Sequence, residues 1–288
     1  MSRGRKPKTI LTGSIWEQIF NKSQGFYFQY IIIQLARKNK ILAEYGGNNL
    51  LEEIKREKGR LVAEKKINKE KSFPVIKDSE ILFEIPSNWT WCRLGAIFNE
   101  IKYGTSKSCD YNSERKSAVL RIPNVSSGII DGTDFKYTDL TDDEIKDLSL
   151  EENDILIIRS NGSKSLVGET ALVTSEFVGF AFAGYLIRLR FSKDLINSKY
   201  LMSATNSEYF RDLIEIPLRT TVGINNINTT EISNLIIPLP PLAEQERIVA
   251  KLEKLMKFCD ELEVSIKQGI KNADQLLQTA LKEALEQK

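Results

Sequence analysis

Four polar segments carry the side chains with which this chain could do chemistry. They are rich in Arg, Lys, Asn, Ser and Thr, whose N–H and O–H groups donate hydrogen bonds. Donors of this kind can bond the oxygens of phosphate groups or the edges of nucleic-acid bases. The candidate residues, in chain order, are Lys102, Thr105, Ser106, Lys107, Arg121, Asn124, Arg159, Asn161, Ser163, Lys164, Arg219, Thr220, Thr221 and Asn225.

Arg121 and Asn124 have the most selective chemistry of this set. An Arg can form two hydrogen bonds with guanine and an Asn two with adenine, and each such pair discriminates against the wrong base by about 1–3 kcal/mol. The loop around Gly104 permits a tight turn, because glycine has no side chain. A second interpretation of Arg121, an ion pair within its own domain, is left equally open by the sequence.

The composition argues against an enzyme. Histidine is absent from all 288 residues, which excludes Ser-His-Asp and Cys-His catalysis and most zinc sites. The chain also has no GxGxxG cofactor loop and no P-loop. Pro240 and Pro241 follow a leucine, whereas an amino-methyltransferase motif has Asn or Asp there. We therefore expect no catalytic residues, no metal ligands and no cofactor bound by the chain itself.

The charge of the chain is uneven, although its net value is only +2. Residues 1–72 contain 16 Lys or Arg against 7 Asp or Glu, which fits a basic arm that contacts phosphate or, equally, a solubilising tail. Three scattered cysteines, Cys92, Cys109 and Cys259, are typical of free thiols in a reducing cytosol. The longest apolar run, residues 26–36, is shorter than the ~20 residues that cross a bilayer. We expect a cytoplasmic protein.

The elements that must position the polar segments are strands and short helices. Asp154–Arg159 is an apolar run that predicts a buried strand, which would deliver Arg159 into a polar turn. Thr170–Thr174 and Gly179–Phe191 predict further strands. In the longer of the two, Arg188 and Arg190 would share the face opposite to the apolar residues.

Helices are expected between these strands. Leu94, Ile97, Phe98 and Ile101 have helical spacing, and Asn206 is a candidate cap for a later helix. Residues 139–154 hold eight carboxylates against one lysine, which predicts a solvated helix or loop that faces away from nucleic acid. The alternative for this acidic stretch is a metal site, although the dense Asp ladder of a calcium loop is missing.

The end of the chain predicts one long helix. It follows an apolar strand at Leu235–Leu239 and the pair Pro240–Pro241, which suits a helix start. At 1.5 Å per residue, a helix of roughly 40 residues is about 60 Å long and needs an equally long partner. The alternative is a helix that lies along the core of its own domain. The apolar seam has the coiled-coil period and contains Ile248, Leu252, Leu255, Cys259, Leu262 and Ile266.

Several blocks of the sequence resemble one known family. Pro238–Val249, which reads Pro-Leu-Pro-Pro-Leu-Ala-Glu-Gln-Glu-Arg-Ile-Val, and the following Leu255–Leu262 are similar to the region that closes a target-recognition domain in type I restriction-modification specificity (S) subunits. Further blocks resemble this family in the same order, so that the resemblance covers about residues 50–288. These blocks are Leu50–Lys71, Phe83–Gly95, Val119–Asn124, Arg159–Ser163 and Arg219–Thr230.

The resemblance implies a mixed α/β (α+β) target-recognition domain followed by a long coiled-coil-type helix. Residues 1–47 form a basic N-terminal segment whose role stays open, because they do not resemble the usual start of the family. Residues 48–82 would be a basic helix, starting near Leu50, and a linker. The DNA-binding domain would span 83–238, and the helix for dimerisation and spacing 239–288.

The resemblance also implies a function. Such a chain reads one half of a bipartite DNA site and docks methyltransferase (M) subunits, which carry S-adenosylmethionine and methylate adenine N6. A restriction (R) subunit, if present, would add cleavage that uses ATP and Mg. By this resemblance the chain contacts double-stranded DNA but is not itself an enzyme, and no membrane is involved.

The sequence departs from the family pattern in one way, because it shows one recognition domain where the family has two. The Pro-Leu-Pro-Pro-Leu-Ala-Glu-Gln block occurs once, and one recognition domain is visible. The sequence therefore resembles half a specificity subunit, and we expect two copies to pair through Leu50–Val62 and Ile248–Leu285 into a homodimer, or one copy to pair with a different half. Two alternatives stay open: a truncated or degenerate half-subunit that acts as a coiled-coil scaffold, and a fragment of a DNA-modifying enzyme.

Overall fold

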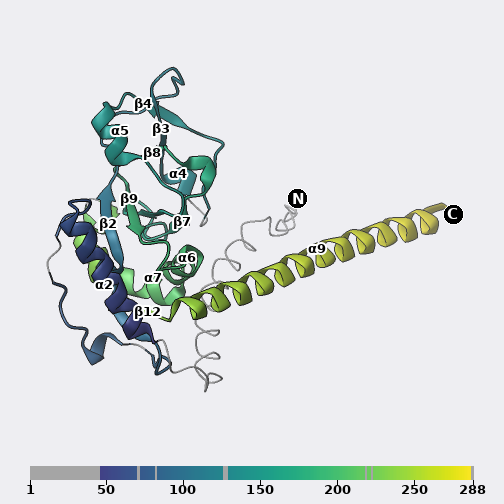
Figure 1. The fold of residues 1–288 in the computed structure, drawn as a ribbon. Helices are drawn as coiled ribbons and strands as arrows, with labels where there is room; N and C mark the ends of the chain where they lie inside the picture. The colour runs from purple at the N-terminus through teal and green to yellow at the C-terminus, as the bar shows by residue number, and fades with distance from the viewer. Residues whose placement is uncertain are drawn as a thin grey trace. The chain divides into compact units, whose positions relative to one another are not determined.

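The computed structural model describes residues 46–69, 72–81, 83–125, 129–217, 219–221 and 223–286 (Figure 1). Its contacts divide the chain into two units, Met1–Glu246 and Arg247–Lys288. The expected basic segment 1–47, except for its last two residues, and the apolar run 26–36 lie outside the described residues. Among the described helices, none has both the length and the apolar character needed to cross a membrane.

The expected fold class, a mixed α/β unit followed by a long helix, is confirmed. The strands are β1 (Thr90–Arg93), β2 (Phe98–Tyr103), β3 (Ser117–Leu120), β4 (Lys136–Thr138), β5 (Ile155–Ile158), β6 (Ser160–Asn161), β7 (Thr170–Leu172), β8 (Ala181–Phe182), β9 (Leu186–Phe191), β10 (Arg219–Thr221), β11 (Ile224–Asn226) and β12 (Ile236–Leu239). The helices are α2 (Gly47–Ala63), α3 (Leu94–Ile97), α4 (Ile122–Val125), α5 (Asp142–Leu148), α6 (Ser198–Thr205), α7 (Glu208–Glu215), α8 (Thr229–Asn234) and α9 (Leu242–Glu286), with 3-10 turns η1 (Asp78–Glu80) and η3 (Ser175–Phe177).

Two sheets form the centre of the first unit. One has the order β2-β9-β5-β7 with antiparallel neighbours, and the other has the order β4-β3-β8 with β3 and β8 parallel. All four residues of β5 are buried, as expected for a strand with a continuous apolar run. Leu156 and Ile158 of β5 join Val119 of β3 and Phe182 of β8 in one hydrophobic cluster, so the two sheets share a core.

The start and the end of the recognition-domain region pair with each other. β1 is antiparallel to β12, with Thr90 opposite Leu239, which confirms the strand predicted before the prolines. Trp89 is 4% exposed and donates its indole N–H to Glu244 in the first turn of α9 at 2.9 Å. Trp89 is therefore a core anchor.

Three local predictions were wrong. The helical spacing from Leu94 gives a single turn, α3, after which the chain becomes β2, because pairing with β9 overrides the local pattern. The predicted strand Gly179–Phe191 is divided into β8 and β9 by a turn at residues 183–185. The cap of α7 is Ser207, whose hydroxyl accepts the amide of Phe210, whereas Asn206 ends the preceding helix.

α9 confirms the predicted long helix and has 45 residues. Leu262 and Ile266 of the predicted seam are 46% and 50% exposed, and Ile270, one step further along, is 60% exposed. Leu252 and Leu255 have intermediate exposure. The C-terminal part of this seam is therefore apolar and accessible within the chain.

Candidate nucleic-acid interface

The turn at residues 183–185 connects three of the four predicted polar segments through backbone hydrogen bonds. Ala183 donates its backbone N–H to the carbonyl of Leu120 at 2.9 Å, and Gly184 donates its backbone N–H to the carbonyl of Thr105 at 2.7 Å. The carbonyl of the turn's third residue accepts the N–H of Arg159 at 2.9 Å. The segments that begin near residues 102, 121 and 159 therefore meet at one place, although they lie far apart in the sequence.

The fourth polar segment reaches the same place through a small sheet. β11 pairs with β6, with Asn225 opposite Asn161, and β10 pairs with β11 along its outer side. The side chain of Asn225 is 6% exposed and donates to the carbonyl of Gly162 at 3.1 Å. Asn225 thus helps to hold the segments together. The predicted residues Arg219, Thr220 and Thr221 occupy the outer strand, β10.

Arg159 lies at the centre of this convergence, and its partners among the described residues are all neutral. Its guanidinium carbon lies over the ring of Tyr103, 4.7 Å from the ring centroid. Nη1 donates to the carbonyl of Gly184 at 3.2 Å and Nη2 to the amide oxygen of Asn226 at 3.1 Å. No carboxylate among the described residues pairs with Arg159. Its positive charge is therefore not compensated within this part of the protein.

Arg121 and Asn124 have a different environment. Arg121 forms an ion pair with Asp134 at 2.6 Å, which is the second interpretation that the sequence left open. Asn124 is 1% exposed, accepts the backbone N–H of Arg121 at 2.8 Å and donates to the carbonyls of Asp131 and Asp134 at 3.0 and 2.9 Å. Because its amide closes this loop from inside, contact between Asn124 and a base would require the loop to open.

The predicted lysines differ in how firmly they are held. Lys102 pairs with Glu100 at 3.0 Å and with Asp147. Burial opposes its charge, but the hydrogen bonds to the two carboxylates outweigh this effect and raise the pKa of Lys102. Lys107 pairs with Glu144 at 2.6 Å, and Lys164 pairs with another surface carboxylate and is 53% exposed. Exposed ion pairs are weak, so Lys107 and Lys164 can exchange their partners for phosphate more readily than Lys102.

The predicted hydroxyl and amide residues shape the loops. Thr105 is 9% exposed and accepts the backbone N–H of Lys107 at 3.1 Å. Asn161 accepts the backbone N–H of Ser163 at 2.7 Å. Such local side-chain bonds stabilise turns. Ser106 and Ser163 are exposed, so their hydroxyls remain accessible on the two loops.

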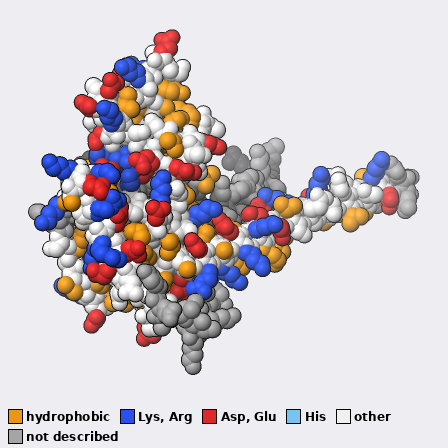
Figure 2. Space-filling view, viewed as in Figure 1, with side chains coloured by type: hydrophobic (Ala, Val, Ile, Leu, Met, Phe, Trp, Pro, Cys, Tyr) orange, Lys and Arg blue, Asp and Glu red, His pale blue; other side chains and the backbone are white. Residues whose placement is uncertain are grey.

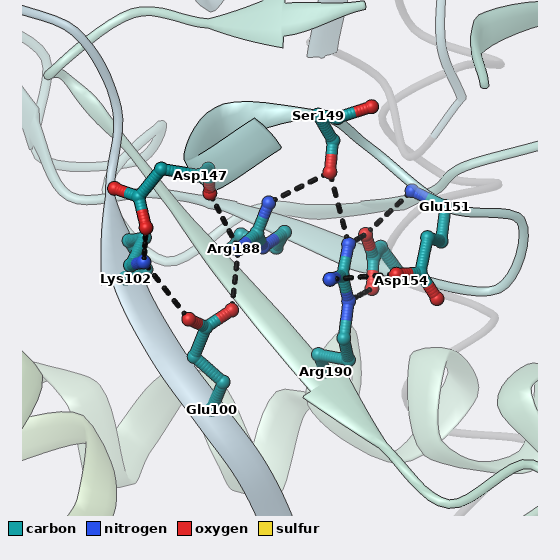
Figure 3. Close-up of polar contacts among 8 residues, drawn as sticks. All are labelled: Glu100, Lys102, Asp147, Ser149, Glu151, Asp154, Arg188 and Arg190. Atoms are coloured by element: carbon teal, nitrogen blue, oxygen red, sulfur yellow. Dashed lines mark hydrogen bonds and ion pairs between the residues drawn. The ribbon is translucent and has the colours of Figure 1, made fainter. Parts of the chain in front are cut away.

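The acidic stretch 139–154 is mostly solvated, as predicted, because six of its eight carboxylates are exposed. Asp154 is the exception (Figure 3). Asp154 is 2% exposed and accepts two hydrogen bonds from Arg190, at 2.8 and 2.6 Å. Arg188 is 1% exposed, pairs with Glu100 and donates to the carbonyl of Ser149 at 2.8 Å. The face of β9 that carries the two arginines is therefore covered by acidic groups. The described residues contain no cluster of acidic or cysteine side chains suited to a metal ion.

The sequence did not single out Tyr103, Tyr185 or Asn226. Tyr185 is 61% exposed in the turn that connects the segments, and Tyr103 is 38% exposed beside Arg159. The sequence feature that could have indicated this place is Gly104, next to Tyr103. A Cβ at Gly104 would lie 2.1 Å from the carbonyl oxygen of Phe182, so only glycine permits this close approach.

Charge does not gather into one basic patch on the face of the first unit shown in Figure 2. Lys and Arg side chains are interspersed there with Asp and Glu. Uniform attraction of a polyanion would need a larger excess of one sign.

Comparison with known proteins gives one family. Residues 86–272 match the family model of the type I restriction modification DNA specificity domain. The chain is 29% identical over 243 residues to the specificity subunit of the type I restriction enzyme EcoAI from Escherichia coli, a match that covers 82% of this chain and 40% of that protein. The specificity subunit of StySPI from Salmonella potsdam is 32% identical over 197 residues, covering 68% of this chain and 42% of that protein.

The chain spans about two fifths of the length of these relatives. Among solved structures, the HsdS subunit from Thermoanaerobacter tengcongensis has a TM-score of 0.46 and 17% identity, with 87% of this chain and 53% of that chain covered. A type I R-M system structure gives a TM-score of 0.48 and 18% identity, with 88% and 54% covered.

Proposed function

The chain belongs to the type I restriction-modification DNA specificity family, and from this membership we propose that it reads one half of a bipartite DNA site for a DNA-modifying complex. In this role it contacts double-stranded DNA and carries out no catalysis. It works in the cytoplasm, where the DNA and the partner subunits are found.

The observation that carries this proposal is the convergence of the four polar segments at the turn 183–185. Base-edge readout needs several side chains held in fixed register, because each base pair is distinguished by the positions of its donors and acceptors. Backbone hydrogen bonds provide that rigidity, and Arg159 provides a positive charge that no carboxylate of the described residues pairs with. Lys107 and Lys164 lie on these segments and are suited to phosphate contacts.

The chemistry belongs to partner subunits in this proposal. Methyltransferase subunits dock on the chain, bind S-adenosylmethionine and methylate adenine N6 on an extruded base. A restriction subunit, where present, adds ATP- and Mg-dependent cleavage. The chain contributes the choice of sequence, so its variants should change which sites are methylated and leave the methyl-transfer step intact.

The exposed face of α9 supports pairing with a second half. Phe258, Leu262, Ile266 and Ile270 are 46–60% exposed on one helix, and such an apolar stripe is normally covered by a partner. A second copy would give a two-fold symmetric reader. Leu252 and Leu255, of intermediate exposure, continue the seam toward the start of the helix, whereas Ile248 of the predicted seam is 0% exposed and is not available to a partner. The same stripe is what a coiled-coil scaffold would show, and this observation keeps that second function in view.

A map of N6-methyladenine across a genome tests the proposal. Cells that express the chain with a compatible methyltransferase subunit are compared with cells that lack only the chain. A split palindromic motif that depends on the chain supports the recognition role and symmetric pairing, and a split asymmetric motif supports recognition with a different second half. No new motif from a complex shown to be assembled would contradict the recognition role and favour the scaffold.

The pairing has a separate readout. Light scattering on the chain with its methyltransferase partner should give a mass that contains two copies of the chain. A complex with one copy would contradict self-pairing without affecting sequence recognition.

A further inference from the structure

We propose that Tyr103 and Arg159 form a preassembled reading unit for a guanine, in which Arg159 contacts the base and Tyr103 is the positioning residue that holds the guanidinium. This inference rests on the proposed DNA-recognition function and names one base that the half-site contains. It assigns a role to Tyr103, which the sequence pattern did not indicate.

Arg159 differs from three other arginines in the charge of its partners. Arg121, Arg188 and Arg190 each face a carboxylate within 4 Å, whereas Arg159 faces none among the described residues. The Nε atoms of Arg121, Arg159 and Arg188 are all buried without a partner, so that atom alone does not distinguish a ligand site. Arg159 differs from the other two in the partners of its guanidinium, which are a carbonyl, an amide oxygen and an aromatic ring.

The guanidinium of Arg159 is held in one orientation by three contacts. The Tyr103 ring takes up one face of the guanidinium at 4.7 Å, a distance at which a cation is attracted to the ring. The bonds to Gly184 and Asn226 hold its two terminal nitrogens. An arginine held at three points loses little further freedom when it binds, which favours a specific contact over a mobile phosphate contact.

Tyr103 is itself fixed at its far end. Its hydroxyl oxygen accepts the backbone N–H of Thr229 at 3.0 Å and donates to the hydroxyl of the same residue at 3.4 Å. Thr229 is the first residue of α8. The ring is therefore tied to a helix terminus on one side and to β2 on the other, so its position is set by two separate elements.

Donors remain for a ligand. An arginine has five N–H groups. The structure uses one on each terminal nitrogen of Arg159, and the one on Nε is buried, so one N–H on each terminal nitrogen is left for a ligand. Two neighbouring donors in one plane match O6 and N7 of guanine, which are both acceptors. Adenine presents a donor next to its acceptor at the same place and would be rejected.

The test measures base preference at every position of the methylated motif. The complex is assembled with full-length chain, and its methylation of a randomised DNA library is sequenced for the wild type, Arg159→Ala, Tyr103→Leu and Tyr103→Phe. Arg159→Ala should reduce the preference for guanine at one position by roughly 5- to 100-fold. Tyr103→Leu should relax the same position, whereas Tyr103→Phe keeps the ring and should stay within about 3-fold of wild type.

Tyr111 provides a matched control. It is 67% exposed and lies under the amine of Lys136 at 4.8 Å, so it is another exposed tyrosine beside a cation. Tyr111→Leu should leave the motif unchanged. Thermal unfolding of every variant is measured in parallel, because a purely structural role of Tyr103 would lower the midpoint and the yield of methylation without changing the preferred base.

Three results would overturn the inference. A motif in which Arg159→Ala and Tyr103→Leu change no position rules out reading by this pair. Equal weakening at all sequences, with the slope of log K against log salt reduced by about 0.9, assigns Arg159 to a phosphate instead. If the wild-type complex methylates no motif, the proposed function fails and this inference fails with it. The two failures are distinguishable because the wild-type complex is assayed before any variant.

Discussion

Arg188 and Arg190 differ from Arg159 in the charge of what surrounds them, although all three lie in or directly after neighbouring strands of one sheet. Arg188 and Arg190 are held by Glu100, Asp154 and the carbonyl of Ser149 (Figure 3). Arg159, one residue beyond β5, has neutral partners and a tyrosine ring. The same residue type therefore serves the fold in one place and is available for a ligand in the other.

The difference follows from the cost of burying charge. A buried cation is tolerated when a carboxylate and further acceptors replace the water that it loses. Arg188 meets this condition at 1% exposure. Arg159 is only partly buried, so water or a ligand must balance its charge. Substitutions of the arginines or of their partners test this difference in environment.

Asp154→Ala should give the largest effect. The change removes the buried carboxylate that accepts two hydrogen bonds from Arg190, and Arg190 keeps the exposed Glu151 as its carboxylate partner, at 2.8 Å. We expect a loss of about 3 kcal/mol in the free energy of unfolding. Urea unfolding of the purified chain measures it. Asp194→Ala, an exposed carboxylate, is the control and should change stability by less than about 0.5 kcal/mol. A loss below about 1 kcal/mol for Asp154→Ala would show that the cluster is not structural.

Glu100→Gln should give an intermediate effect that depends on pH. Burial tends to raise the pKa of Glu100, but the charge of Arg188 and the bonds from Lys102 and Arg188 lower it overall. Because the pKa is lower in the folded state, the ion pair contributes stability above the unfolded pKa of about 4.3, and this is lost as pH falls through the folded value. At neutral pH the variant should lose about 1.5–3 kcal/mol.

The pH profile separates this prediction from a simple packing defect. Wild type and Glu100→Gln should approach each other in stability as the pH falls below the unfolded pKa of about 4.3 and through the lowered folded pKa of Glu100, because the wild-type carboxylate becomes protonated over that range. A constant difference between the two proteins from pH 7 to pH 3 would mean that the charge of Glu100 is not what stabilises Arg188.

Arg159→Ala should give the smallest effect on folding. It removes two hydrogen bonds to neutral groups and a ring contact from a partly exposed site, so a loss of about 1–2 kcal/mol is expected. Its effect on DNA selection should be the larger one. A loss above about 3 kcal/mol in the free energy of unfolding, measured in the same urea experiment, would show that Arg159 is a structural residue like Arg188. The difference between Arg159 and the arginines of β9 would then not hold.

Parts of this arrangement could be predicted from the sequence. The apolar run before Arg159 predicted a buried strand with a polar turn after it, because four consecutive buried residues leave little choice. The prolines after β12 predicted the start of α9 for a similarly local reason. Local chemistry thus placed the polar segments in loops and the seam on a helix.

Other parts depended on contacts that no local pattern encodes. Arg188 finds Glu100 across 88 positions of sequence, and Arg121 finds Asp134, so the sequence could not say which arginine would be neutralised. The turn at 183–185 was hidden because apolar residues on both sides predicted one continuous strand. Its position became visible only through its bonds to Leu120, Thr105 and Arg159.

If Arg159 selects DNA while the arginines of β9 maintain the fold, Arg→Lys exchanges should separate the two roles, because they keep the charge and remove the planar guanidinium. Methylation of a randomised library is compared for complexes that carry Arg159→Lys or Arg190→Lys, with unfolding measured alongside. Arg159→Lys should change the preferred base at one position at nearly wild-type stability, and Arg190→Lys should lower stability and keep the motif. An unchanged motif for Arg159→Lys, or a changed motif for Arg190→Lys, would contradict the account.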